Sequence, residues 1–231
     1  MLIFDQEITG LARDLIGARL FVRGTGGMVL ETEAYGRNDP ASHSFRGPSA
    51  RNAAMFGPPG SVYVYLSYGC HLCLNVVGRA GEAVLIRAML PEAGVALMRE
   101  RRRGGAPLLA GPGRTGQALG IGLADNGKRF DGAEFTLESR TEARELLVGP
   151  RIGITRAADL PWRFGLAEAS GLSRAFPAQA RGNNLARRAF ATSRAGRASG
   201  RSASDEGGDT DARAVEGTAE GSRGGPGGQT R

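Results

Sequence analysis

The side chains best suited to chemistry are concentrated in one short region of this sequence. Three of the four tyrosines stand within the stretch SVYVYLSYG, and the fourth is Tyr35. Both histidines and both cysteines also lie between Tyr35 and Asn75. Aromatic faces stack on planar or cationic ligands, while histidine and cysteine titrate or bind metals. We therefore expect the functional site to be built around residues 35–75.

The two cysteines, Cys70 and Cys73, form a C-x-x-C pair. This spacing is used by dithiol redox sites and by zinc half-sites. A structural zinc site normally needs four ligands, and only His43 could add to the set, because the chain has no other cysteine. The pair also lies in an apolar strand pattern, where small buried thiols are common. We therefore expect no metal and no cofactor. A thiol redox or zinc protein is the alternative, which replacement of both cysteines by serine would exclude.

Two carboxylates alternate in the segment VLETEAY. Glu31 and Glu33 share one face of an expected strand and stand between apolar neighbours. Carboxylates in such a position are either solvated on an open face or held in a site. The loop GRNDPASHS has turn chemistry that can bring His43 back towards Glu33 and Tyr35. A carboxylate beside aromatic walls can act as a general base with a tuned pKa.

The elements that must position these residues are helices interleaved with hairpins. One helix is expected from Ile8 to Leu15, closed by Gly17, and a second over residues 91–103, while residues 111–121 are expected to contain a short helix entered through glycines. The expected strands cover residues 19–23, 28–35, 61–66, 72–77 and 83–89, with the glycine-rich residues 24–27 as the turn between the first two. In the strand 61–66, Tyr63 and Tyr65 face one side, and Val62 and Val64 face the other. This irregular alternation predicts an α+β fold.

The composition predicts one domain, residues 1–175, followed by a disordered tail, residues 176–231. From Ala191 onward the chain has one large aliphatic residue, Val215, and no aromatic residue. Such a stretch cannot bury enough apolar surface to offset its ordering entropy.

The charge and the apolar pattern limit the partners. The formal net charge of +7 favours a polyanion, although the preference for arginine fits a GC-rich genome equally well. No apolar stretch approaches the roughly 20 residues that cross a bilayer. The N-terminus has no secretory pattern either, so we expect an intracellular protein without a membrane partner.

Six blocks follow one another along the chain: VLETEAY, ASHSFRGPSARNAAMF, GSVYVYLSYGCHLCLNVV, AVLIRAMLPEAG, GPGRTGQALGI and PRIGITRAADLPWRF. These blocks, in this order, resemble the successive signature blocks of the alkyladenine (3-methyladenine) DNA glycosylase family. The resemblance runs from about Phe4 to Phe164. The resemblance implies a DNA repair enzyme with a curved, mostly antiparallel, open barrel-like sheet flanked by helices. The segment LAEASGLSR, which follows Gly165, matches the family's ending only loosely.

The resemblance also implies roles for individual residues. Glu33 would activate the attacking water, and Arg87 would help to hold that water. The extruded base would stack between Tyr35 and His43 on one side and Tyr65 on the other.

Two further roles follow for the rim and the wall of the pocket. Tyr68 would enter the minor groove of the DNA as the wedge that fills the vacated stack. Asn75 would line the pocket and disfavour the exocyclic amine of guanine. His71 is either a neighbour of the DNA surface or a packed histidine, and Tyr63 has no role beyond the preference of strands for aromatic residues.

Elementary chemistry agrees with these roles. Extruding a base costs a few kcal/mol of unstacking, and aromatic stacking returns about 1 to 3 kcal/mol per base. A cationic alkylated purine gains cation–π attraction as well, and a carboxylate also stabilises positive charge that develops on the sugar. A glycosylase that also cleaves the backbone usually needs an amine nucleophile, and the only lysine, Lys128, lies far along the chain.

The sequence thus predicts a monofunctional purine DNA glycosylase that leaves an abasic site. We expect it to act as a monomer on double-stranded DNA that contains damaged purines, in the cytoplasm or nucleoid if the source is bacterial. The alternative is a non-catalytic binder of damaged or bent DNA that uses the same wedge and basic surface.

Overall fold

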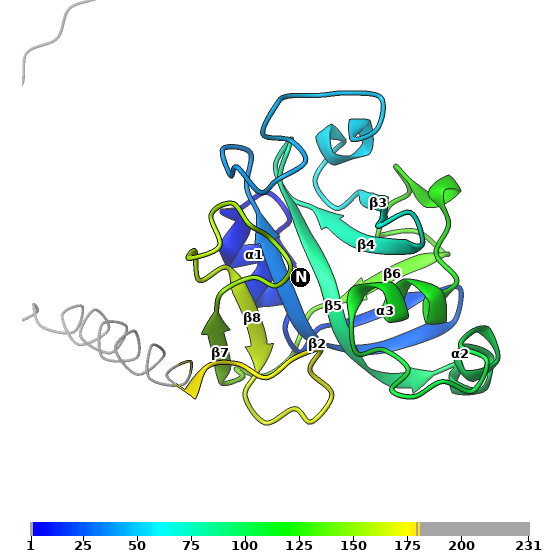
Figure 1. Ribbon diagram of the computed structural model, residues 1–231. Coiled ribbons are helices and arrows are strands. Elements are labelled where there is room, and N and C mark those ends of the chain that lie inside the picture. The colour runs from blue at the N-terminus through cyan, green and yellow to red at the C-terminus, as the bar shows by residue number, and fades with distance from the viewer. Residues whose placement is uncertain (1, 179, 181–231) are drawn as a thin grey trace, which may run out of the picture.

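A single curled sheet forms the body of the protein. The computed structural model describes residues 2–178 and 180, and this part of the chain forms an eight-stranded sheet. Six strands are ordered β3-β4-β5-β2-β1-β6, β8 pairs with β2, and β7 pairs with β8. Every pairing between these strands is antiparallel. The sheet bends into a half-barrel with the helices on its flanks (Figure 1). The predicted α+β fold with a curved, mostly antiparallel sheet is confirmed.

The bounds of the elements are as follows. The strands are β1 (Arg19–Val22), β2 (Thr25–Tyr35), β3 (Val62–Ser67), β4 (His71–Val77), β5 (Ala83–Ala93), β6 (Phe135–Glu138), β7 (Leu146–Gly149) and β8 (Arg163–Leu166). The helices are α1 (Ile8–Leu15), α2 (Val95–Arg101) and α3 (Pro112–Leu119), with short 3-10 turns at Ala53–Phe56 and Leu123–Asp125.

Strand β2 changes partner along its length. One edge pairs with β5 almost throughout, while the other edge pairs first with β1 and then, over Glu31–Glu33, with β8. The pairing with β5 is irregular between Val29 and Thr32. Such irregularities bend a strand and increase its twist. The two carboxylates therefore sit at a bend of the central strand, with a neighbouring strand on each side.

Helix α1 covers one side of the sheet. Its buried residues are Ile8, Leu11, Ala12 and Leu15, the spacing that the sequence predicts. The carboxylate of Glu7 accepts hydrogen bonds from the first backbone N–H groups of the helix, which would otherwise lack partners. The helix is therefore anchored by its apolar stripe and by its N-terminal cap.

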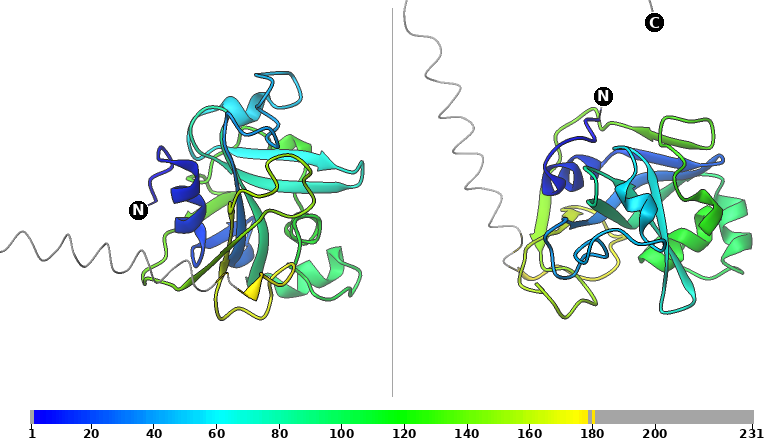
Figure 2. Two further views of the ribbon diagram at one scale, coloured as in Figure 1. Left: turned by 60° about the vertical axis from the view of Figure 1, so that its left-hand side comes forward. Right: turned by 90° about the horizontal axis from the view of Figure 1, so that it is seen from above.

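Helix α3 lies directly on β4 because two of its residues are glycines. A Cβ atom on Gly116 would lie 1.9 Å from the carbonyl oxygen of Leu72, and one on Gly113 would lie 2.7 Å from the ring of His71. The motif GPGRTGQALGI thus allows the backbone of the helix to approach the β3–β4 hairpin. That hairpin projects from the body of the molecule (Figure 2).

Two boundaries differ from the sequence prediction. The turn between β1 and β2 is Arg23-Gly24 alone, with both residues at positive φ, so β2 begins at Thr25. Such a two-residue turn matches the twist of a hairpin. The expected helix 91–103 is also wrong at its start, because β5 continues to Ala93 by pairing with the glycines of β2. The helix begins only after Gly94, which is in the left-handed conformation.

The C-terminal part of the described chain completes the sheet. Strands β6, β7 and β8 were not predicted from the sequence. Phe176, at the start of the expected tail, packs against Gly165 and lies under the guanidinium of Arg163. The rest of that tail, except for residues 177, 178 and 180, lies outside the described residues. Among the helices described, none has the length and apolar character needed to cross a membrane.

Candidate active site

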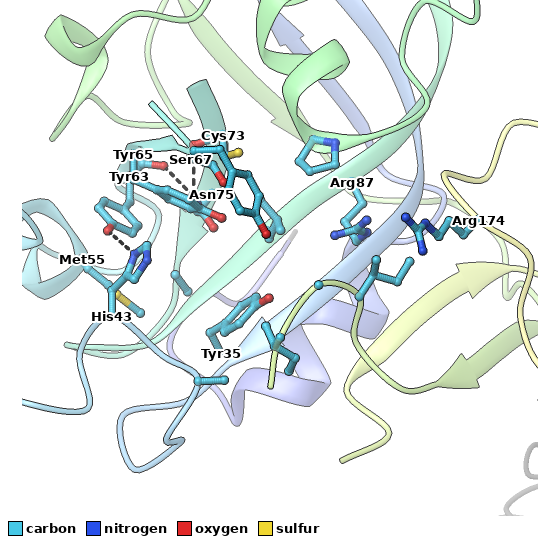
Figure 3. Close-up of a pocket in the computed structure, with 18 residues that line it drawn as sticks. Tyr35, His43, Met55, Tyr63, Tyr65, Ser67, Cys73, Asn75, Arg87 and Arg174 are labelled. Atoms are coloured by element: carbon cyan, nitrogen blue, oxygen red, sulfur yellow. Dashed lines mark hydrogen bonds between the residues drawn. The ribbon is translucent and has the colours of Figure 1, made fainter. Parts of the chain in front are cut away.

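A cavity of about 360 Å³ opens beside the β3–β4 hairpin (Figure 3). Its walls carry the rings of Tyr35, His43, Tyr63 and Tyr65. Most of the other lining residues come from β4, β5, the start of α3 and the loop that follows β7, and the tip of the β3–β4 hairpin and the segment after β8 add Tyr68 and Arg174. Within the described chain, the lining contains arginine side chains but no aspartate or glutamate. The cavity is therefore aromatic, and its exposed surface has no negative charge.

Glu33 lies behind this wall, at the end of β2. Its side chain has no exposed area, and three groups hold its carboxylate. Oε1 accepts a 2.8 Å hydrogen bond from the backbone N–H of Ile152 and lies 3.3 Å from Nη1 of Arg87. Oε2 accepts a 2.8 Å hydrogen bond from the hydroxyl of Tyr35. The carboxylate is thus fixed in place directly behind three residues that line the cavity, Tyr35, Arg87 and Ile152.

Arg87 connects Glu33 with the second carboxylate of β2. Its Nε lies 3.1 Å from Oε1 of Glu31, and its Nε and Nη2 each lie 3.3 Å from Oγ of Ser173. Burial alone would lower the pKa of Arg87, but Glu33 and Glu31 outweigh it and the pKa is raised. The guanidinium remains charged and lines the cavity.

Glu31 is a junction between the site and the C-terminal segment. Its carboxylate is fully buried and also binds Nε of Arg163 at 2.8 Å and Oγ of Ser173 at 2.7 Å. The backbone N–H of Ser173 donates to its other oxygen. Sequence reasoning left Glu31 without a role and did not find Arg163 or Ser173. The sequence signal that could have pointed to these partners was the presence of two carboxylates on one face of an apolar strand, which need positive or hydrogen-bonding partners when buried.

The aromatic wall is held by contacts between its own members. The His43 ring bonds through Nδ1 to the hydroxyl of Tyr63 at 2.8 Å and meets the Tyr65 ring edge-on, with 4.6 Å between the centroids. Tyr63 therefore orients His43, a role that its strand position alone does not predict. A stacked base needs about 3.5 Å on each face, which the edge-on contact between His43 and Tyr65 does not leave. In this structure the predicted sandwich has no room for a base between the rings of His43 and Tyr65.

The titratable groups of the wall are held neutral. Burial raises the pKa of Tyr35 and of Tyr65, and it raises that of Tyr63 to about 12. Burial, together with the positive charge of Arg51, lowers the pKa of His43. Near neutral pH the wall therefore consists of uncharged rings.

Tyr35 rests on a buried ion pair that sequence reasoning missed. The guanidinium of Arg151 lies 4.7 Å from the centre of the Tyr35 ring and bonds to Asp39 through Nη2 at 3.0 Å. Both partners of this pair are fully buried, and Nη1 of Arg151 also donates to the carbonyl of Ala34. The pair fixes the back face of the ring whose hydroxyl binds Glu33. The sequence signal that could have pointed to this pair was the block PRIGITR, which contains Arg151.

Asn75 lines the cavity from β4 with its amide fixed. Nδ2 donates to the backbone carbonyls of Tyr63 at 3.1 Å and Cys73 at 3.2 Å. These two bonds use both amide donors and define which side of the amide carries the oxygen. The structure thus brings Asn75 to the same cavity as the four aromatic rings.

Tyr68 stands at the tip of the β3–β4 hairpin. Its side chain is 85% exposed, and its backbone has a φ of 49°, which is uncommon for a bulky residue. The following Gly69 also has positive φ, so the tip is a tight turn that presents the tyrosine ring outward. The residue predicted as the wedge is thus an exposed ring in a tight turn beside the cavity.

The cysteines do not form a metal site in the described chain. Cys70 is exposed at the hairpin tip, whereas Cys73 is buried against Tyr65, where burial raises the pKa of its thiol. No group of three or more metal-binding side chains occurs among the described residues. His71 is exposed, and its ring packs beside Gly113.

The sequence matches a known family of DNA repair enzymes. Residues 2–170 match the family described as methylpurine-DNA glycosylase, and the chain belongs to that family. A protein of Rhodopseudomonas palustris named "Putative 3-methyladenine DNA glycosylase" is 52% identical over 179 residues, which is 75% of this chain and 87% of the relative. Proteins of the same name from Nitrosospira multiformis and Rhizobium meliloti are 49% and 50% identical over 75% of this chain, covering 92% and 95% of their own lengths. The predicted family is confirmed.

Proposed function

We propose that this protein excises alkylated purines from duplex DNA. In this proposal the damaged nucleotide is flipped out of the helix, its base enters the aromatic cavity, and a water activated by Glu33 hydrolyses the N-glycosidic bond. The observation that carries the proposal is the position of the Glu33–Arg87 pair, which is buried directly behind a cavity walled by aromatic rings.

The neutral wall suits a cationic base. Methylation at a ring nitrogen gives a purine a positive charge, and aromatic faces attract cations through their negative π-surface. The lowered pKa of His43 and the raised pKa values of Tyr35 and Tyr65 keep every ring uncharged near neutral pH. A charged imidazolium would repel such a base, so the burial of His43 favours binding.

The bond changes balance with one carboxylate and one water. The C1′–N bond breaks with its electron pair moving to the purine, which leaves as a neutral base when it was cationic. The water oxygen bonds to C1′, and Glu33 takes the water's proton. Oε2 of Glu33 accepts one hydrogen bond, from Tyr35, so one of its two lone pairs is available for that proton.

Arg87 helps to hold the water and keeps the two carboxylates of β2 apart. Its Nη1 lies 3.3 Å from Glu33, and its Nε lies 3.1 Å from Glu31. Without a cation between them, the two buried carboxylates would repel each other. The negative charge of Glu33 also stabilises the positive charge that develops on the sugar.

The proposed enzyme is monofunctional. The only lysine, Lys128, lines neither the cavity nor its rim and is bound to Asp125 and Glu134 at 3.0 and 2.9 Å. An engaged amine remote from the cavity cannot form a Schiff base with the sugar. Borohydride treatment of a reaction mixture should therefore trap no covalent enzyme–DNA adduct, and a trapped adduct would contradict this part of the proposal.

The decisive experiment is release of methylated adenine from duplex DNA treated with a methylating agent. Loss of a general base typically slows a reaction about 100- to 10,000-fold, so we expect Glu33→Gln to fall in that range. Glu92→Gln is the matched control, because Glu92 forms an exposed ion pair with Arg19 away from the cavity. Wild-type excision by Glu33→Gln would show that the base is wrongly assigned. Tight binding of damaged duplex by the wild type without base release would favour the non-catalytic binder.

A further inference from the structure

A second hollow of about 530 Å³ continues from the mouth of the aromatic cavity. It runs between the tip of the β3–β4 hairpin, the start of α3 and the segment that contains Ser173. The two hollows share Tyr68, Arg87 and Arg174. The second hollow is therefore the open side of the same cleft, next to the proposed wedge.

This hollow carries a concentration of positive charge. Arg87, Arg102, Arg114 and Arg174 line it, and its lining within the described chain contains no aspartate or glutamate. Arg87 is paired with the buried Glu31 and Glu33. The other three arginines have no carboxylate partner within the described residues, so their charges repel one another unless an anion binds between them. Of these three, Arg102 donates a hydrogen bond to Gln117 and Arg114 donates one to the carbonyl of Ala110.

Arg174 differs from Arg87, Arg102 and Arg114 because hydrogen bonds hold its backbone in place while its side chain makes none within the described residues. Ser173, the residue before it, is bound to Glu31 through both its N–H and its hydroxyl. The carbonyl of Arg174 accepts a hydrogen bond from Arg163, whose guanidinium lies 3.8 Å from the centre of the Phe176 ring. The side chain is exposed, and no hydrogen bond or ion pair to it is recorded within the described residues. In Figure 3 it reaches towards the cavity from the side of Arg87.

We propose that Arg174 binds a phosphate of the DNA backbone next to the flipped nucleotide. The inference rests on the proposed function, because a base inside the cavity places its own sugar and phosphates at the cavity mouth. A guanidinium fits a phosphate through paired hydrogen bonds, and it carries no sequence preference. The anchored backbone holds this group ready, so little conformational entropy is lost on binding. Arg102 and Arg114 extend the positive surface towards the neighbouring phosphates.

The same segment thereby ties DNA binding to the catalytic pair. Ser173 contacts both Glu31 and Arg87, and Arg174 follows it in the chain. Contact of a phosphate with Arg174 therefore acts on the peptide that buttresses Arg87. Residues after β8, where the family resemblance is weakest, would contribute a binding group to the site.

The first test is the salt dependence of binding to a duplex that carries a stable abasic-site analogue. Each phosphate contact contributes about 0.9 to the slope of log affinity against log salt. We expect Arg174→Ala to lower that slope by about 0.9 and to weaken binding about tenfold at low salt, with Arg174→Lys in between. Arg129→Ala is the matched control, because it removes the same charge from a side chain that lines neither hollow and pairs with Asp131. Equal effects of the two alanine variants would overturn the proposal.

The second test locates the contact. Replacing a single phosphate by an uncharged methylphosphonate should weaken wild-type binding at the phosphates that flank the lesion. In Arg174→Ala one of these substitutions should have no further effect, because its partner is already absent. Equal losses for both proteins at every position would contradict the contact.

These binding readouts are independent of base release. Suppose that the wild type releases no alkylated base but that Arg174→Ala has a smaller salt-dependence slope of DNA binding than the wild type. The proposed reaction would then fail, and the phosphate site would stand. If the wild type released base and Arg174→Ala bound as the wild type does, the phosphate site alone would fail.

Discussion

Nε of Arg87 lies 3.1 Å from the carboxylate of Glu31, and Nη1 of the same guanidinium lies 3.3 Å from that of Glu33. One buried arginine thus bridges two buried carboxylates on the same strand face. Arg163 provides the second positive charge at Glu31. Two carboxylates and two guanidinium groups therefore balance in charge where all four side chains are buried, so the loss of any one of them leaves a buried charge without its partner.

Glu31→Gln should cost stability and slow catalysis. Removing one partner from a buried ion network leaves Arg87 and Arg163 under-compensated, which costs about 3 to 5 kcal/mol in the free energy of unfolding. Arg87 would also lose a contact that orients it, so we expect a lower excision rate in the protein that remains folded. Denaturant unfolding and single-turnover excision measure the two effects. Glu92→Gln, in an exposed pair, should cost less than about 1 kcal/mol. Equal stability losses in the two variants would contradict this account.

Tyr68→Ala should impair function without loss of stability. The ring is 85% exposed, so its removal leaves no cavity in the core, and it relieves a side chain held at positive φ. We expect slower excision from duplex DNA and little change on single-stranded substrate, since only a duplex has a stack to fill. Leu123→Ala, which truncates another exposed apolar side chain, should leave both activities unchanged. Equal losses on both substrates would indicate a packing role for Tyr68.

Gly116→Ala should destabilise the contact between α3 and β4. The added Cβ would lie 1.9 Å from the backbone carbonyl of Leu72, and neither backbone can yield without moving the helix. We expect a loss of about 1 to 3 kcal/mol, the usual cost of overpacking, measured by denaturant unfolding. Gly122→Ala is the control, because the nearest atom to its added Cβ is 4.0 Å away. Two variants of equal stability would refute the close approach.

The stability of the protein should decrease at acidic pH partly through His43. Burial and Arg51 lower its pKa in the folded state below the ordinary value of 6.5. Below that value the unfolded chain takes up a proton that the folded chain resists, so this contribution is absent at higher pH and destabilises the fold as the pH falls. Urea unfolding at pH 7.5 and 5.5 should show a smaller loss for His43→Gln than for the wild type. Parallel losses would mean that His43 is not the responsible group.

Chelation and loss of the thiols should leave excision intact. Cys70 is exposed and Cys73 packs beside Tyr65, with no group of three metal-binding side chains in the described part of the chain. We expect the double variant Cys70→Ser/Cys73→Ser to release methylated adenine near the wild-type rate, with or without a chelator. Loss of activity in a variant that still folds would support the alternative of a thiol redox or zinc protein.

Much of the sheet could be predicted because its signals are local. Alternation along VYVYLS and the helical spacing of Ile8, Leu11 and Leu15 each depend on neighbours within a few residues. The missed elements lacked such signals. Strand β8 is only four residues long and owes its place to pairing with β2 and β7, and the end of β5 depends on glycines about 65 positions earlier in the chain.

The sequence alone determined the family, the aromatic composition of the site and the residues Glu33, Tyr35, His43 and Tyr65 as candidates, because these are properties of residue type and spacing. Only the tertiary structure decided that Glu31 is shared by Arg87, Arg163 and Ser173, that Tyr63 orients His43 and that Arg151 supports Tyr35. These partners stand from 20 to 142 positions apart in the chain. The curl of the sheet brings them together, and burial away from water makes each contact strong enough to set the charge and position of its partner.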